Sequence, residues 1–228
     1  MRSSGDIEAL ARGNGVEIFG VADASGFLDE GYQGKRPQDI MPDVRSVIVI
    51  GVRVPRGCME PLPKGRAEYT NTLLAGTVVL RSAAYRIAQM LEAEGEAASI
   101  IPVEGSEFGY WYADRETLKA DMSTKYAARL AGLGSYGVSN LLLIPGFGPA
   151  YRMTAVITTA ELECGRPADM LHDSCSDCLS CVEVCPADAL HADGSIDRKA
   201  CRDYMFTELG GLRCGLCVKA CWENFQRR

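Results

Sequence analysis

Ten cysteines are the residues of this 228-residue chain best suited to chemistry, and eight of them lie in its last quarter. Residues 175–186 read CSDCLSCVEVCP, which is the spacing C-x2-C-x2-C-x3-C-P. In bacterial ferredoxins the first three cysteines of such a run bind one 4Fe-4S cluster, while the fourth binds a second cluster. The run therefore predicts a pair of iron–sulfur clusters.

A second run, CGLCVKAC at residues 214–221, has the spacing C-x2-C-x3-C and lacks a leading cysteine. Cys201, thirteen residues before Cys214, can supply the missing ligand. In two-cluster ferredoxins the last cysteine of each run binds the cluster of the other run. Applied here, this rule assigns all eight cysteines, and none is left over. Cluster one takes Cys175, Cys178, Cys181 and Cys221, and cluster two takes Cys185, Cys201, Cys214 and Cys217.

Zinc is the alternative ion for these cysteines. Four-cysteine zinc sites also use C-x2-C pairs, but those pairs are separated and lack a third cysteine in step before Cys-Pro. Two neighbouring 4Fe-4S clusters relay single electrons and perform no bond chemistry on a substrate by themselves.

The remaining Cys58 and Cys164 are interpreted as small buried residues. His172 and His191, each near an aspartate, are interpreted as surface residues without a catalytic assignment.

Composition and charge narrow the class of protein. The formal net charge is −6 and the sequence pI is about 5.1, which argues against a basic nucleic-acid-binding protein. Hydrophobic residues make up 47% of the chain, as in soluble globular proteins. No apolar run approaches the roughly 18 residues that a membrane-spanning helix needs, and the first residues lack the apolar centre of a secretory signal. We therefore expect a cytoplasmic protein, where reducing conditions favour thiolate ligation of metal over disulfides.

Helices and strands alternate over residues 1–165, which predicts a layered α/β domain whose strand order stays open. A long helix with Leu73, Leu80 and Leu91 on its apolar face is one of these elements. Residues 166–228 are expected to form a small ferredoxin-like domain. Strands are predicted at residues 16–22, 46–54, 98–103, 140–144 and 151–160, the last two joined by the turn PGFGP, and shorter helices at residues 4–12 and 121–131 with Asp121 as an N-cap.

The helix at residues 121–131 is followed by the glycine-rich loop GLGSYG, residues 132–137. Its letters match G-x-G-x-x-G, but a dinucleotide-binding loop follows a strand and opens a helix, whereas this loop ends a helix and leads into a strand. Two interpretations stay open. Either the glycines cap the helix and form a tight turn, or their missing side chains let the backbone approach a large flat cofactor.

The stretch STKYAARLAGLGSYGVSNLLLIPGFGPAYRMTAVITTAEL, followed by CSDCLSCVEVCPADAL, KACRDYMFTEL and CGLCVKACWENF, resembles the epoxyqueuosine reductase family and its relatives, the reductive dehalogenases. The resemblance covers about residues 121–226. It implies a cobalamin on the first domain, reduced by two 4Fe-4S clusters on the second. It also implies that seven residues lie against the cobalamin: Gly132, Leu133, Gly134, Ser135, Tyr136, Gly137 and Asn140.

Several features depart from the family pattern. The lysine that usually follows the loop glycine is replaced by Val138, and the position of the family's acidic proton donor falls near Leu118, so no catalytic residue carries over. Tyr110, Trp111 and Tyr112 are interpreted as packing residues, with a pocket wall or a phenol proton donor as the alternative. The chain also lacks the C-terminal helical extension of the tRNA-modifying members, which argues against a tRNA substrate.

We expect an iron–sulfur oxidoreductase in which two clusters pass electrons to a cobalamin that reduces an unidentified substrate. A low-potential donor such as a ferredoxin or a flavodoxin would supply the electrons, and a small molecule or a corrinoid protein would receive them. Two alternatives stay open. One is a non-catalytic electron carrier or corrinoid-reducing partner without substrate turnover, and the other is an α/β domain that holds a flavin.

Overall fold

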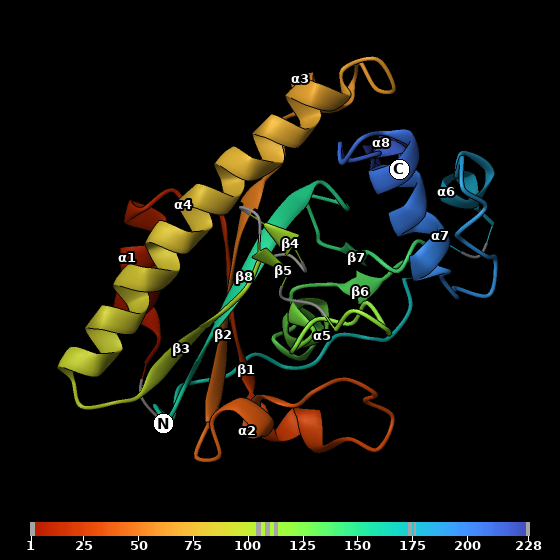
Figure 1. Cartoon of the computed structure of the whole chain (residues 1–228). Helices are drawn as coiled ribbons and strands as arrows, with labels where there is room; N and C mark the ends of the chain where they lie inside the picture. Colours follow the sequence, from red (N-terminus) through yellow and green to blue (C-terminus); the bar gives the residue numbers. More distant parts are fainter. Residues whose placement is uncertain are drawn as a thin grey trace. The chain divides into compact units, whose positions relative to one another are not determined.

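A computed structural model describes residues 3–103, 106–107, 110–111, 114–172, 175 and 177–226 (Figure 1). The chain groups into two compact units, each built from three separate stretches of sequence. The first unit comprises Met1–Val52, Thr77–Leu133 and Arg152–Ala168, and the second comprises Arg53–Gly76, Gly134–Tyr151 and Asp169–Arg228. These units are interleaved along the chain, whereas the predicted division after residue 165 is a single cut. That division stays a prediction about domains.

A four-stranded sheet forms the centre of the first unit, with the strand order β1-β2-β8-β3. Its strands are β1 (Ile18–Asp23), β2 (Ser46–Arg53), β3 (Ala98–Ile101) and β8 (Tyr151–Thr158). β1 pairs antiparallel with β2, and β3 pairs antiparallel with β8. The predicted α/β class is confirmed, and the sheet supplies the strand order that the sequence pattern left open.

The core of the first unit lies where α1 (Gly5–Gly13) and α4 (Arg66–Ala93) cover one side of the sheet (Figure 1). All of β2 except its last residue is buried, as expected for a strand with both faces covered. On α4, Leu80 and Leu91 share the apolar face and pack in the same cluster as Ile48 of β2. Burying each such aliphatic side chain stabilises the fold by about 1.5–3 kcal/mol.

A separate apolar cluster lies in the second unit. Buried Leu62 and Tyr69 pack against apolar side chains of α8 (Leu216–Gln226). The ammonium of Lys219 on α8 donates hydrogen bonds to the carbonyls of Glu60, at 2.6 Å, and Leu62, at 2.8 Å. The cysteine-rich end of the chain therefore has apolar support from a segment about 150 residues earlier, which the sequence pattern did not predict.

Short elements complete the fold. None of the helices within the described ranges is long and apolar enough to cross a membrane. The remaining elements are the 3₁₀ helix η1 (Ala24–Leu28), the helices α2 (Pro37–Ile40), α3 (Arg56–Met59), α5 (Thr124–Leu130), α6 (Ser180–Glu183) and α7 (Arg198–Asp203), the π-helix η3 (Tyr204–Glu208), and the strand pairs β4 (Ser106–Glu107) with β5 (Tyr110–Trp111) and β6 (Ser135–Tyr136) with β7 (Leu142–Leu143).

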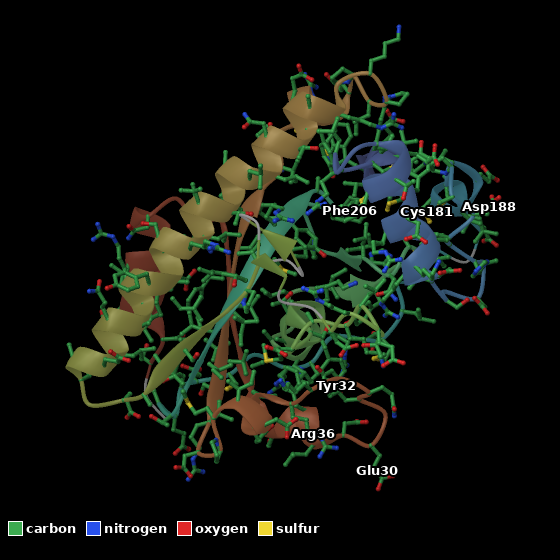
Figure 2. The ribbon with its side chains drawn as sticks, in the orientation of Figure 1. Glu30, Tyr32, Arg36, Cys181, Asp188 and Phe206 are labelled. Atoms are coloured by element: carbon green, nitrogen blue, oxygen red, sulfur yellow. The ribbon has the colours of Figure 1, made fainter. Side chains whose placement is uncertain are left out.

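Helix α5 begins later than the sequence pattern predicts. Its N-cap is Ser123, whose Oγ accepts a hydrogen bond from the backbone N–H of Tyr126 at 3.2 Å. The predicted cap, Asp121, instead forms an ion pair with Lys35 at 2.9 Å, so the N-cap prediction was wrong. The ring of Tyr126 lies 4.6 Å from that of Tyr32, centroid to centroid, so the first turn of the helix packs on the segment that carries Tyr32 (labelled in Figure 2).

Replacing Ser123 with alanine is expected to lower the free energy of unfolding by about 1 kcal/mol, because a helix N–H loses its cap. Ser123→Thr keeps a hydroxyl at the same position and is expected to retain most of that stability. Urea denaturation of the three proteins measures the difference. Equal stability of the alanine variant and the wild type would contradict the capping role.

The predicted strand at residues 140–144 is shorter in the structure and has a different partner. It corresponds to β7, which pairs with β6, so the expected hairpin with the next strand was wrong. The hydroxyl of Tyr151 explains how the backbone of β7 is satisfied on its other side. It accepts from the N–H of Leu142 at 3.0 Å and donates to the carbonyl of the same residue at 2.8 Å.

Candidate functional site

Three short helices of the second unit carry half of the eight clustered cysteines. α8 carries Cys217 and Cys221, which are four residues apart and therefore share one face of the helix. α6 carries Cys181, which is 8% exposed, and α6 packs against α8 (Figure 2). α7 carries Cys201, and the side chain of Asp197 caps this helix by accepting from the N–H of Ala200 at 2.9 Å.

The first group of thiols surrounds Cys221. Burial, and after it the Coulombic effects of the thiols of Cys181, Cys175 and Cys178, raise the pKa of Cys221 to about 12. The pKa of Cys181 is likewise raised by burial first and then by Cys175 and Cys178. These four side chains are therefore electrostatic neighbours, although Cys221 lies 40 residues beyond Cys181, the nearest of the other three in sequence.

The second group surrounds Cys217. Burial is the largest cause, and together with the effects of Cys201 and Cys214 and the smaller effects of Cys181 and Cys185 it raises the pKa of Cys217 to about 12. The pKa of Cys201 is raised by burial and then by Cys185 and Cys214. The second group thus contains the four remaining cysteines, and the effect of Cys181 on Cys217 indicates that the two groups adjoin. Both groups have the membership that the crossing rule predicts, and the ligand assignment itself stays a prediction.

The chemistry of these groups fits 4Fe-4S clusters. Iron binds the thiolate form of cysteine, so a cluster must displace protons that the buried thiols otherwise hold tightly. The backbone N–H of Ala189 lies 3.3 Å from Sγ of Cys185, where it can stabilise a ligating thiolate. Within the described ranges, no three Cys, His, Asp or Glu side chains are spaced for a single metal ion. A cubane has a different geometry, because each thiolate binds its own iron.

The first glycine of the loop ends helix α5. Gly132 has φ +76°, and its N–H donates to the carbonyl of Arg129, while the N–H of Leu133 donates to that of Ala128, both at 2.9 Å. These two hydrogen bonds form a Schellman motif, in which glycine is favoured at the left-handed position. A Cβ on Gly132 would lie 2.4 Å from the carbonyl oxygen of Arg166. The helix-cap interpretation therefore accounts for this glycine.

The second glycine lies against β7. A Cβ on Gly134 would lie 2.2 Å from the carbonyl oxygen of Leu143, so only glycine allows these two backbones to approach. The space beside both Gly132 and Gly134 is thus filled by the chain's own backbone. Close backbone approach was one of the two predicted roles of these glycines, but the group that approaches is a carbonyl of the same chain.

The third glycine connects the loop to the first thiol group. A Cβ on Gly137 would lie 3.3 Å from Sγ of Cys175. The N–H of Gly137 donates to the carbonyl of Leu141 at 2.7 Å, and Asn140, with φ +58°, lies in the five-residue turn between β6 and β7. Ser135 and the adjoining tyrosine form β6 itself. The structure therefore brings the predicted cofactor loop and one predicted cluster ligand together, which their sequence separation did not indicate.

Several other predicted residues have ordinary structural surroundings. Cys58 is buried in the apolar cluster of the second unit, and its thiol donates to the carbonyl of Pro55 at 3.0 Å. Cys164 is half-buried, and its thiol donates to the carbonyl of Leu162 at 3.3 Å. The backbones of Tyr110 and Trp111 form β5, while their side chains, and all of Tyr112, lie outside the described residues. Leu118 is half-buried, directly follows the turn at residues 115–117 and has φ +54°.

Replacing Gly134 with alanine is expected to destabilise the protein by about 2–5 kcal/mol in the absence of any cofactor, because Cβ would overlap the carbonyl of Leu143. Gly146→Ala is a matched control: this glycine has φ +76° and no atom near the added Cβ, so only the strain of about 1–3 kcal/mol applies. Thermal unfolding of the cofactor-free proteins measures both. A Gly134→Ala protein of wild-type stability would restore the open-surface interpretation.

Part of the chain matches a known family model, and most of it is similar in sequence to known reductases. Residues 171–191 match the family model described as 4Fe-4S binding domain. The chain is 27% identical over 186 residues to the tetrachloroethene reductive dehalogenase of Dehalobacter restrictus, covering 81% of this chain and 29% of that protein. It is 31% identical over 121 residues to the epoxyqueuosine reductase of Cyclobacterium marinum, covering 46% of this chain and 38% of the other. The chain thus spans about a third of the length of these curated relatives.

Two solved structures extend the comparison to the fold. The epoxyqueuosine reductase from Streptococcus thermophilus superposes with a TM-score of 0.64 at 17% identity, covering 99% of this chain and 67% of that one. A reductive dehalogenase whose structure suggests a mechanism for B12-dependent dehalogenation superposes with a TM-score of 0.69 at 20% identity, covering 94% of this chain and 31% of that one. The predicted resemblance is confirmed: the chain has the fold of epoxyqueuosine reductases and reductive dehalogenases and carries a 4Fe-4S binding domain.

Proposed function

We propose that this chain, which has the fold of epoxyqueuosine reductases and reductive dehalogenases, is an iron–sulfur oxidoreductase that passes electrons through two 4Fe-4S clusters to a cobalamin. The observation that carries the proposal is the grouping of eight buried or half-buried thiols into two adjoining sets of four. Cluster one would be held by Cys175, Cys178, Cys181 and Cys221, and cluster two by Cys185, Cys201, Cys214 and Cys217.

The geometry of the two sets supports electron transfer between them. A 4Fe-4S cluster, when bound, accepts and releases one electron at a time. Cys217 and Cys221, one turn apart on α8, would each hold a different cluster, so a single helical turn joins the two sets covalently. Cys181 and Cys185 repeat this arrangement across four residues. Short, rigid connections of this kind keep two redox centres at a fixed separation.

The position of the loop supports an order for the relay. Sγ of Cys175 belongs to set one and lies beside Gly137 of the loop that the resemblance assigns to the cofactor. Set two includes Cys214 and Cys217. Gly215 lies between them and packs on Tyr69, because a Cβ added to this glycine would lie 2.5 Å from the tyrosine ring. We propose that electrons enter at cluster two and leave through cluster one. A ferredoxin or a flavodoxin is the proposed donor, and the cytoplasm is the proposed location.

Cobalamin is supported by the resemblance and by the B12-dependent mechanism named for one dehalogenase of the same fold. The described residues set limits on how this chain would hold it. The positions that a Cβ would take at Gly132 and Gly134 are filled by the carbonyls of Arg166 and Leu143, so a corrin could not approach either glycine from that side.

The iron–sulfur part of the proposal is tested on protein purified without oxygen. Two 4Fe-4S clusters require about eight iron and about eight sulfide ions per chain, and reduction by dithionite should produce an electron paramagnetic resonance signal from paired, interacting clusters. The double variant Cys58→Ala/Cys164→Ala is the control and should keep the full iron and sulfide content. One zinc per chain, or absence of sulfide, would contradict the proposal.

A second function is favoured by the buried Gly134, which packs against the carbonyl of Leu143: an electron carrier that reduces a corrinoid on another protein without turning over a substrate itself. Titration of hydroxocobalamin into the cluster-containing protein separates the two. A change in the corrin spectrum that saturates at one equivalent supports the cobalamin reductase. Reduction of cobalamin at a rate that stays proportional to its concentration, without saturable binding, supports the carrier. A yellow chromophore released by acid precipitation would instead indicate a flavin.

A further inference from the structure

Ser139, in the turn between β6 and β7, carries a buried hydroxyl that has no hydrogen-bond partner in the part of the chain that the structure describes. The residue is 5% exposed, and its Oγ makes no hydrogen bond to any described residue. Buried hydroxyls are nearly always satisfied, so an exception indicates a group that the protein chain does not itself supply. Unpaired buried atoms also occur on Gln38, Arg66, Arg129 and Arg152, but each of those side chains bonds through another atom.

The turn that holds Ser139 lies beside the cysteine segment. The backbone of Tyr136 pairs in parallel with that of Leu171, and its carbonyl accepts from the N–H of His172 at 2.9 Å. The carbonyl of His172 in turn accepts from the N–H of Cys175 at 3.1 Å. These bonds hold the start of the turn beside the segment that leads to Cys175.

The contact between Gly137 and Cys175 shows that the turn itself lies next to this cysteine. A Cβ on Gly137 would lie 3.3 Å from Sγ of Cys175, and Ser139 is only two residues farther along the turn. No side chain at residue 137 separates the turn from the sulfur, because a glycine stands there. The unpaired hydroxyl is thus held in a buried turn that touches a proposed ligand of cluster one.

We infer that Ser139 donates a hydrogen bond from its hydroxyl to a sulfur of cluster one, either the thiolate of Cys175 or a sulfide on the same side. This inference rests on the proposed function, since it requires cluster one. Hydrogen bonds to cluster sulfur stabilise the reduced state, which carries one more negative charge, and so raise the reduction potential. Ser139 is a positioning and tuning residue here, which sets how readily cluster one holds its electron.

The test compares Ser139→Ala with Ser139→Thr, which keeps the hydroxyl. Potentials are measured by redox titration followed by electron paramagnetic resonance, with cluster one identified as the signal that is lost in Cys221→Ala. In the alanine variant, the ratio of reduced to oxidised cluster one at a fixed applied potential is expected to fall between about threefold and tenfold. Cluster two should be unchanged, and the threonine variant should resemble the wild type in both clusters.

Ser123→Ala is the matched control, because it removes a serine hydroxyl that is already bonded within the first unit. It should leave both cluster potentials at their wild-type values. The cluster-free Ser139→Ala protein should be at least as stable as the cluster-free wild type, since it loses an unsatisfied polar group. A structural role for the hydroxyl would instead lower that stability.

The outcomes separate this inference from the proposed function. Normal iron and sulfide contents with an unshifted potential in Ser139→Ala would overturn the hydrogen bond and leave the two clusters in place. Equal shifts in the alanine and threonine variants would also overturn it, because packing and not the hydroxyl would then set the potential. Iron or sulfide missing from the wild-type protein would remove the proposed function first.

Discussion

Cys185→Ala is expected to abolish cluster two and to leave cluster one intact, although Cys185 lies in the run that supplies three ligands of cluster one. The physical reason is the grouping of the thiols. Cys185 is an electrostatic neighbour of Cys201 and Cys217, whereas Cys175 is a neighbour of Cys181 and Cys221. Iron content is expected to fall from about eight to about four per chain.

The second run provides the matched comparison. Cys217 and Cys221 lie one turn apart on α8, so their replacement perturbs the helix to the same extent while removing ligands of different clusters. Cys217→Ala should leave the same paramagnetic signal as Cys185→Ala, and Cys221→Ala should leave the other signal. If Cys217→Ala and Cys221→Ala instead leave the same signal and Cys185→Ala leaves the other, each run holds its own cluster and the crossed assignment is wrong.

The cluster-free protein is expected to lose stability steeply between about pH 9 and pH 12, while the cluster-containing protein does not. In the folded cluster-free chain, burial and neighbouring thiols raise the pKa of Cys217 and Cys221 to about 12, against about 9 in the unfolded chain. Above pH 9 the unfolded state therefore releases protons that the folded state still holds. Each of these thiols then lowers the free energy of unfolding by about 1.4 kcal/mol per pH unit.

The sign of this dependence is opposite to that of a carboxylate in an ion pair. Below pH 9 both thiols are protonated in both states, so the contribution is fully present there and is lost as the pH rises toward 12. Urea denaturation under a phosphine reductant at pH 8, 9 and 10 measures the slope. The Cys217→Ala/Cys221→Ala protein is the control and should have a much flatter profile. Equal slopes would contradict the raised pKa values.

Much of the cysteine chemistry was accessible from the sequence. Ligand spacings such as those of residues 175–186 are local, because a short run of backbone determines where its thiols point. The same holds for the buried strand β2 and for the apolar face of α4. There the spacing of the hydrophobic residues alone predicts a strand or a helix. These predictions required no knowledge of how distant segments meet.

The role of the glycine loop needed the tertiary structure. A sequence shows that Gly132 and Gly134 lack side chains, but it does not show which atoms occupy the space beside them. Those atoms are carbonyls of Arg166 and Leu143, 34 and 9 residues away. Ser139 is a similar case, since its burial and its missing partner depend on neighbours that no local pattern specifies.

By itself, the sequence determined the two cysteine runs, their crossed assignment as a prediction, and the alternation of helices and strands. Only the tertiary structure decided the strand order β1-β2-β8-β3, the interleaving of the two units, and the support of the cysteine-rich end by Leu62 and Tyr69. The reason is physical: residue type and spacing fix local backbone and ligand geometry, whereas strand pairing and core packing depend on contacts between segments that are far apart along the chain.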